Sequence, residues 1–171
     1  MIVKLFDIQN GVVVPTEHCY TLETLKKIID EYPEDHLKIY QYLFYMTYPN
    51  PDLNPFFNLA EDDKEEIILA EINAEFSPED DHIPGALKLC RQLYETPTMR
   101  AYNGIKQMLD RLANYMATTS ITDGRDGNIT ALTNTAAKFQ QIREAYKGAY
   151  KDLQEEQSSK VRGGQGLAYD S

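Results

Sequence analysis

The sequence predicts a mainly α-helical fold, and three patterns along its 171 residues support that fold class. Apolar side chains recur three and four residues apart over most of the chain, which is typical of amphipathic helices. An Asn-Gly pair between two β-branched runs predicts one small β-hairpin. Glycine and serine crowd the last residues, which predicts an extended tail. We therefore expect a helical bundle with a long antiparallel helix hairpin, a small N-terminal β-hairpin and an extended C-terminal tail.

The β-hairpin is expected from residues 2–8 and 12–14, joined by Gln9, Asn10 and Gly11. A lone hairpin is only marginally stable in water, so these strands have to pack on helices or join another sheet. An exposed strand edge would offer a partner subunit a place to add a strand.

The next elements are helices. Thr21 is expected to cap a helix that runs through Glu31. Residues 34–48 predict a helix that is apolar on nearly every side and therefore lies at the centre of the core. Asn54 and Pro55 are typical of a helix start, with the proline at the first helical position.

Two further start signals follow. Ile68, Leu69, Ile72 and Phe76 recur at helical spacing and are expected to face inward, with the carboxylates of this segment facing out. Ser77-Pro78-Glu79-Asp80 predicts a helix start. Pro84-Gly85 is expected to interrupt it, before a short helix over residues 87–94.

The second half of the chain predicts the long helix hairpin. Thr96-Pro97 should start a helix ending near Ala117, and a glycine-containing loop, residues 118–128, should lead through Asn128 as N-cap into a helix ending near Glu156. The first helix carries a short heptad seam. Its residues are Tyr102, Ile105, Leu109, Leu112 and Met116.

The formal net charge of −10 is concentrated in one segment. Residues 61–81, the acidic segment, hold ten acids and one base, a charge of −9, against seventeen acids and sixteen bases elsewhere. Such a chain is unsuited to gripping nucleic-acid phosphates, so we expect no sequence-specific nucleic-acid binding. The segment is either a solvated helix face or a docking site for a basic protein surface. In the second case Glu65, Glu66, Glu71 and Glu75 are the candidate contacts.

Chemical motifs are scarce, and we expect neither an enzyme nor a cofactor or metal site. The run Gly163-Gly164-Gln165-Gly166 lacks the Lys-Ser/Thr pair of a phosphate-binding loop. Cys19 and Cys90 fit no metal or redox spacing. His82 beside Asp80 and Asp81 is a cation site of low specificity at best, and a surface histidine otherwise.

The chain has 12 tyrosines and no tryptophan. Tyrosine suits protein interfaces, and it equally suits the core and boundary of a helical domain, so this composition leaves both open. The first residues carry an acidic group where a signal peptide would be apolar, and no segment approaches the length of a membrane span. Synthesis in the cytoplasm, without a membrane partner, is the expectation.

We expect residues 1–157 to form one domain and residues 158–171 to form an extended arm. Such a glycine-rich terminus is disordered alone and becomes ordered only on a partner, for which a neighbouring subunit is the simplest candidate. The candidate contacts of this arm are Lys160, Val161, Arg162, Gly163, Gly164, Gln165, Leu167 and Tyr169.

Four stretches resemble a virion protein of tailed bacteriophages, most closely of crAss-like phages. They are residues 15–20 (PTEHCY), 94–98 (YETPT), 124–129 (GRDGNI) and the ending from RGGQ at 162–165 through Tyr169-Asp170. The resemblance spans most of the chain but contains no motif with an assigned role, so no functional residue is carried over from it.

This resemblance implies a ring subunit of the head–tail connector, or neck, of a virion. The implied partners are further copies of the chain in a twelve-fold ring, together with the portal and neighbouring ring proteins. A capsid auxiliary protein, a packaged cargo protein and an acidic adaptor protein are the alternatives.

Overall fold

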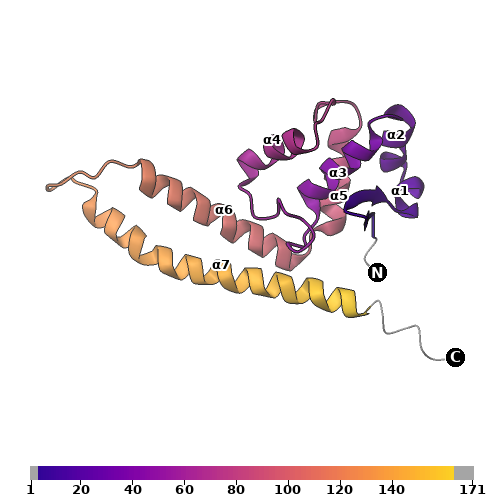
Figure 1. Ribbon diagram of the computed structural model, residues 1–171. Coiled ribbons are helices and arrows are strands. Elements are labelled where there is room, and N and C mark those ends of the chain that lie inside the picture. Colours follow the sequence, from indigo (N-terminus) through magenta and orange to yellow (C-terminus); the bar gives the residue numbers. More distant parts are fainter. Residues whose placement is uncertain (1–3, 164–171) are drawn as a thin grey trace. The chain divides into compact units, whose positions relative to one another are not determined.

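A computed structural model describes the backbone of residues 4–163 and the side chains of residues 4–158. The chain divides into two compact units, an N-terminal unit, Met1–Glu95, and a hairpin unit, Thr96–Ser171. Their boundary lies inside the segment expected to form one domain. The predicted fold class is confirmed, because the described chain is mainly helical with one two-stranded antiparallel sheet (Figure 1). Among the described helices, none combines the length and the apolar character that crossing a bilayer requires.

The predicted β-hairpin opens the N-terminal unit. Strands β1 (Phe6–Gln9) and β2 (Val12–Pro15) pair antiparallel, with Ile8 opposite Val13. Asn10 and Gly11 have φ angles of 54° and 79°, the left-handed conformation that a tight two-residue turn requires at both positions. Phe6 and Val13 are buried in the core of the unit, so the hairpin packs on the helices as expected.

Helices α1 (Glu17–Thr21) and α2 (Glu23–Glu31) follow the hairpin. The prediction that Thr21 caps a helix is wrong: Thr21 ends α1, and its hydroxyl donates a hydrogen bond to the carbonyl of His18 at 3.0 Å. Helix α1 already begins at Glu17, directly after Thr16, whose backbone N–H and hydroxyl both lie within hydrogen-bond distance of the Leu5 carbonyl, at 2.9 and 3.0 Å.

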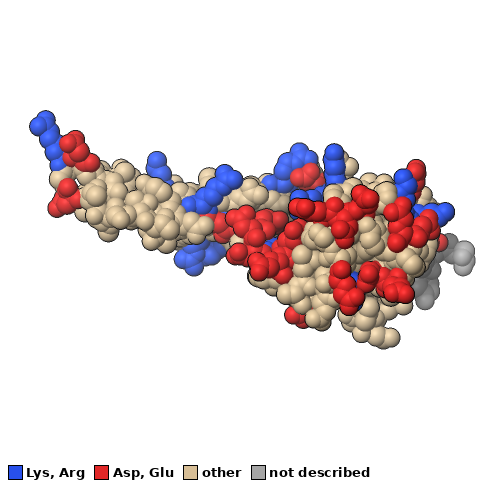
Figure 2. All heavy atoms as spheres, turned by 90° about the horizontal axis from the view of Figure 1, so that it is seen from above, with Lys and Arg blue, Asp and Glu red and all other residues tan. Residues whose placement is uncertain are grey.

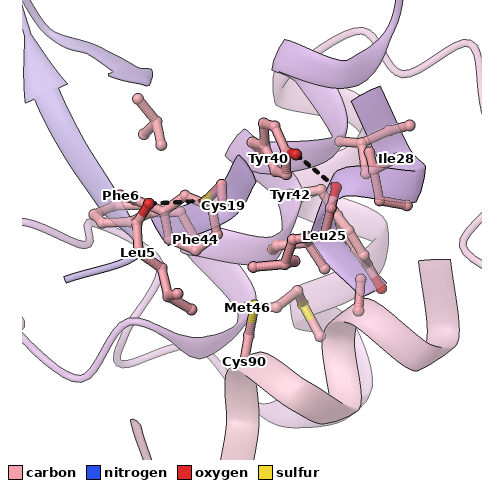
Figure 3. Packing of buried hydrophobic residues seen from close by; sticks show 14 of the residues in the cluster. Leu5, Phe6, Cys19, Leu25, Ile28, Tyr40, Tyr42, Phe44, Met46 and Cys90 are labelled. Carbon is pink, nitrogen blue, oxygen red and sulfur yellow. Dashed lines mark hydrogen bonds between the residues drawn. The ribbon is translucent and has the colours of Figure 1, made fainter. Parts of the chain in front are cut away.

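Helix α3 (His36–Thr47) is the central helix of the unit, as its all-round apolar pattern predicts. Its buried side chains meet those of the hairpin, α1, α2 and α5 in one cluster (Figure 3). Inside the cluster the Tyr40 hydroxyl donates to the carbonyl of Leu25 at 2.8 Å, and the Cys19 thiol to that of Leu5 at 3.0 Å. The buried residues of α3 are Ile39, Tyr40, Tyr42, Leu43, Phe44, Met46 and Thr47.

Asn54 and Pro55 do not start a helix, which corrects the prediction. Asn54 is buried, and its Nδ2 donates to the carbonyls of Tyr45 and Tyr48 at 2.9 and 3.0 Å. These carbonyls belong to the end of α3, where the helix leaves backbone acceptors without partners of its own. The amide is therefore used to finish α3 rather than to cap a new helix.

The remaining helices of the unit are α4 (Glu61–Glu71) and α5 (Ile83–Tyr94). Ile68 is buried, and Leu69, Ile72 and Phe76 pack partly buried against the core, so the predicted inward face is confirmed.

Both expected signals between α4 and α5 have other roles. The residues from Ser77 onward form a turn rather than a helix start. The backbone N–H of Ser77 donates to Asp80 Oδ2 at 2.8 Å, and the Ser77 hydroxyl accepts from the N–H of Glu79 at 3.3 Å. Pro84 does not interrupt a helix but lies in the first turn of α5, where the missing N–H loses no hydrogen bond.

The hairpin unit consists of α6 (Pro97–Thr118) and α7 (Ile129–Gly163), packed together along their length. The Thr96 side chain accepts from the N–H of Met99 at 3.2 Å, so the predicted helix start is confirmed. Helix α7 continues past Glu156 to Gly163, and residues 158–163 are thus helical rather than part of an extended arm. The described part of α7 thus reaches the first glycine of the terminal run.

Candidate interaction surfaces

The two helices of the hairpin unit meet along one apolar seam whose burial is incomplete. All five seam residues predicted on α6 are at least half-buried, but no described side chain in residues 107–152 is fully buried. Two helices alone cannot enclose a core, so such a hairpin leaves surface for further helices. Along α7 the half-buried and buried positions recur at three and four residues: Leu132, Thr135, Phe139, Ile142, Tyr146, Ala149, Leu153 and Glu156.

Three tyrosines fix the register of the seam near the start of α6. The ring of Tyr102 lies 5.4 Å from that of Tyr146 and 6.0 Å from that of Tyr150, measured between centroids. The hydroxyls of Tyr102 and Tyr146 are hydrogen-bonded at 3.0 Å. Six residues before Tyr102, the Thr96 hydroxyl donates to Glu156 Oε2 at 3.0 Å.

A second row of side chains runs along α6 beside the seam and is exposed throughout. It consists of Gly104, Met108, Arg111 and Tyr115, which we name the α6 outer stripe. Their spacing of four, three and four residues places them within about 60° of one another around the helix. Met108 and Tyr115 are each 45% exposed, and a Cβ at Gly104 would meet nothing within 4 Å. No ion pair holds Arg111 among the described residues.

The loop between α6 and α7 is held in shape by side-chain hydrogen bonds from Asn128. Asn128 Oδ1 accepts from the backbone N–H of Thr122 at 2.9 Å, and Asn128 Nδ2 donates to the carbonyl of Ser120 at 2.9 Å. Asn128 precedes α7 as predicted, but these bonds commit its side chain to the loop. A Cβ at Gly127 would collide with the carbonyl oxygen of Thr122. This loop presents Ile121, which is 72% exposed.

The four predicted contacts of the acidic segment differ in their surroundings. Glu65 is half-buried, and its carboxylate accepts a hydrogen bond from the Tyr42 hydroxyl at 2.8 Å. Glu66 and Glu71 are exposed. Glu75 is exposed and lies 3.8 Å from the Lys38 ammonium. The structure therefore separates one core-anchored carboxylate from three that face solvent.

The outward side of α4 combines carboxylates with an apolar centre. Asp63, Glu66, Ile67, Ala70 and Glu71 are all exposed, and we name them the α4 outer face. Ile67 is 42% exposed. The single base of the acidic segment, Lys64, is only 4% exposed and donates to the carbonyl of Met46. Its ammonium also lies 3.8 Å from Glu61 Oε1, a carboxylate outside the α4 outer face.

The two units differ in charge. The N-terminal unit has nineteen acidic and seven basic residues, a formal charge of −12, whereas the hairpin unit has eight acidic and ten basic residues, a charge of +2. Figure 2 shows many acidic side chains on the N-terminal unit and basic side chains spread along the hairpin unit. The acidity is thus a property of one unit and not only of the acidic segment.

The predicted contacts near the C-terminus are only partly described. Lys160, Val161, Arg162 and Gly163 belong to the last turn of α7, whose side chains are outside the described set. Gly164, Gln165, Leu167 and Tyr169 lie outside the described residues altogether.

The side chains that could bind a metal ion or act as nucleophiles are dispersed or buried. In the described part of the chain, no three histidine, cysteine, aspartate or glutamate side chains are grouped to hold a metal ion. His82 Nε2 lies 3.0 Å from Glu31 Oε1 rather than against Asp80 or Asp81. Cys19 and Cys90 are buried free thiols, and burial raises their pKa values to about 11 and about 12. Neither is poised as a thiolate nucleophile.

The α6 outer stripe is not among the contacts predicted from the sequence. Its signal is present in the sequence as a second row at the same spacing as the seam, displaced by one residue towards the N-terminus. The burial of the tyrosines also distinguishes this stripe. Of the tyrosines whose side chains are described, all are at least half-buried except Tyr20 and Tyr115. Most tyrosines thus belong to the core and its boundary, and Tyr115 is one of two exceptions.

Comparison with known proteins gives no relative, because no family model, no curated protein and no solved structure matches the chain.

Proposed function

We propose that this chain is a structural subunit of a bacteriophage virion that assembles into a ring of the head–tail connector and binds the portal or neighbouring ring proteins. The observation that carries the proposal is the division of one chain into an acidic compact unit and a basic two-helix hairpin. A subunit with two unlike, complementary surfaces associates head to tail, and such contacts close into rings when the rotation permits. The resemblance of the four sequence stretches to phage neck proteins supports the placement in a virion.

The half-buried seam of the hairpin also supports a structural role. A helix pair that exposes Met108, Tyr115 and Ile121 has apolar surface available for neighbours. Assembly proteins use such extended elements to reach across a contact.

Two measurements test this role. Particles purified from infected host cells should contain the chain at a fixed ratio to the portal protein, near one to one, as measured by quantitative mass spectrometry. Antibody labelling should place it at the neck. Absence from purified particles would refute a virion role, and labelling spread over the capsid would favour a capsid auxiliary protein.

An acidic adaptor protein is the second candidate, favoured by exposed carboxylates on α4 that form no ion pair within the described chain, such as Glu66 and Glu71. Charge reversal at Glu66, Glu71 and Glu75 should abolish binding of a basic partner in that case. Glu65 is left unchanged because Tyr42 binds it. Particles that incorporate this variant normally would argue against the adaptor role.

A further inference from the structure

We propose that the α6 outer stripe is a docking site for the α4 outer face of a second copy of this chain. The proposal deepens the proposed function, since it names the contact through which a ring of copies would form. It rests on that function only in requiring self-association.

The stripe has the composition of an interface centre. Methionine, tyrosine and arginine are enriched where protein surfaces meet, and here Met108, Arg111 and Tyr115 lie on one line with Gly104. Gly104 has no side chain and open space around it, which lets another backbone approach α6 closely. The four-three-four spacing is that of a helix-packing ridge, so the occupant is expected to be a helix.

Charge and length select α4 as that helix. The α4 outer face has an apolar centre, Ile67 and Ala70, flanked by three carboxylates, and Arg111 between Met108 and Tyr115 supplies the opposite charge. Helix α4 has 11 residues, about 16 Å, and the stripe from Gly104 to Tyr115 spans about the same length. An α6–α6 contact would instead bring two copies of Arg111 into one apolar stripe, which repulsion disfavours.

The contact is between unlike surfaces. Each copy therefore offers one α6 outer stripe and one α4 outer face, and a chain of such contacts continues from copy to copy. This predicts an open series or a closed ring, of which a two-fold dimer with two reciprocal contacts is the smallest.

Cysteine crosslinking of the purified full chain tests the pairing. Met108→Cys and Ile67→Cys are prepared as separate variants; the native thiols are buried and do not interfere. Mixed in equal amounts under mild oxidation, the two variants should form a disulfide-linked heterodimer, and neither should crosslink alone. Leu53→Cys, 45% exposed in the N-terminal unit, replaces Ile67→Cys as the matched control and should not crosslink.

A charge swap provides the second readout. Arg111→Glu in the Met108→Cys variant should lower the crosslink yield about tenfold, because it sets like charges against the α4 carboxylates. Asp63→Arg with Glu71→Arg in the Ile67→Cys partner should restore it.

The outcomes separate the possibilities. Crosslinking of Met108→Cys with itself would establish an α6–α6 contact and overturn the proposal. No crosslink between the mixed Met108→Cys and Ile67→Cys variants would also overturn it. Because these measurements use purified protein, their failure is distinct from absence of the chain from particles, which would refute the virion role alone.

Discussion

The hydroxyl of Tyr42 on α3 donates a hydrogen bond to the carboxylate of Glu65 on α4 at 2.8 Å. Burial is the main reason that the pKa of Tyr42 is well above its ordinary range, so this hydroxyl keeps its proton and remains the donor. The bond fastens α4 to the central helix and leaves the rest of its carboxylates outside.

Tyr42→Phe should lower the free energy of unfolding by about 1–2 kcal/mol, because it removes a hydrogen bond to a charged group. The midpoint of urea unfolding measures the change. Tyr20→Phe is the control, since Tyr20 is 53% exposed and its loss should fall within about 0.5 kcal/mol of zero. Equal effects of the two substitutions would show that the Tyr42–Glu65 bond contributes nothing.

Gly148→Ala should raise the stability of the free chain by about 0.5–1 kcal/mol. Gly148 lies inside α7, and a Cβ there would meet nothing within 4 Å, so alanine improves helix propensity without a clash. Thermal unfolding of the purified protein is the measurement. Gly124→Ala should act in the opposite direction, because φ at Gly124 is +109°. A destabilising Gly148→Ala would contradict the open surroundings of this residue.

Asn128→Ala should loosen the loop between α6 and α7. It removes the acceptor of the Thr122 N–H and the donor to the carbonyl of Ser120, and amide hydrogen exchange in residues 119–128 should become faster by about tenfold. Asn134→Ala, at an exposed position in α7, is the control and should leave that exchange unchanged. Unaltered exchange in the Asn128 variant would mean that Gly124 and Gly127 shape the loop without the side-chain bonds.

The chain should unfold progressively in alkali. Burial raises the pKa of Cys19 from 9.0 to about 11 and that of Cys90 to about 12. Because these folded-state values exceed the unfolded value, the stabilisation is complete below pH 9.0 and is lost as the pH rises through 11 and 12. Between pH 9.0 and its folded-state pKa, each thiol lowers the free energy of unfolding by about 1.4 kcal/mol per pH unit.

Thermal melts between pH 8 and 11 measure this loss. A Cys19→Ala, Cys90→Ala variant should start from a lower melting temperature, because both side chains are buried, but should show a shallower decline just above pH 9. The same slope in both proteins would place the alkaline sensitivity elsewhere, first in buried tyrosines such as Tyr40, whose pKa burial also raises.

The sequence predicts the helices and the β-hairpin well because their signals are local. The Asn10-Gly11 turn needs only two positive φ angles, and the heptad spacing on α6 needs only one neighbour helix. The start signals at Thr21, Asn54 and Ser77 mislead because the same side chains also finish helices and close turns. Their partners, such as the carbonyl of Tyr45 for Asn54, lie at distances along the chain that a local pattern does not contain.

The candidate surfaces likewise divide into features with a local sequence signal and features that depend on distant residues. Composition alone reveals the acidic segment, but which carboxylates face outward depends on Tyr42, more than twenty residues before Glu65. To predict the α6 outer stripe from sequence, one has to know which side of α6 the seam occupies. The boundary between the units falls at a helix start that Thr96 and Pro97 predict, but a local start signal does not show that the helices on its two sides belong to separate units.

Lys64 has a consequence for how the molecule behaves in salt solution. Its ammonium group is buried beside the carbonyl of Met46 and lies 3.8 Å from Glu61 Oε1, so it offsets the charge at the start of α4, while Glu66 and Glu71 face solvent further along the helix. Small cations will therefore accumulate over this one helix. Retention on an anion-exchange column should depend on α4 far more than an overall charge of −10 would suggest.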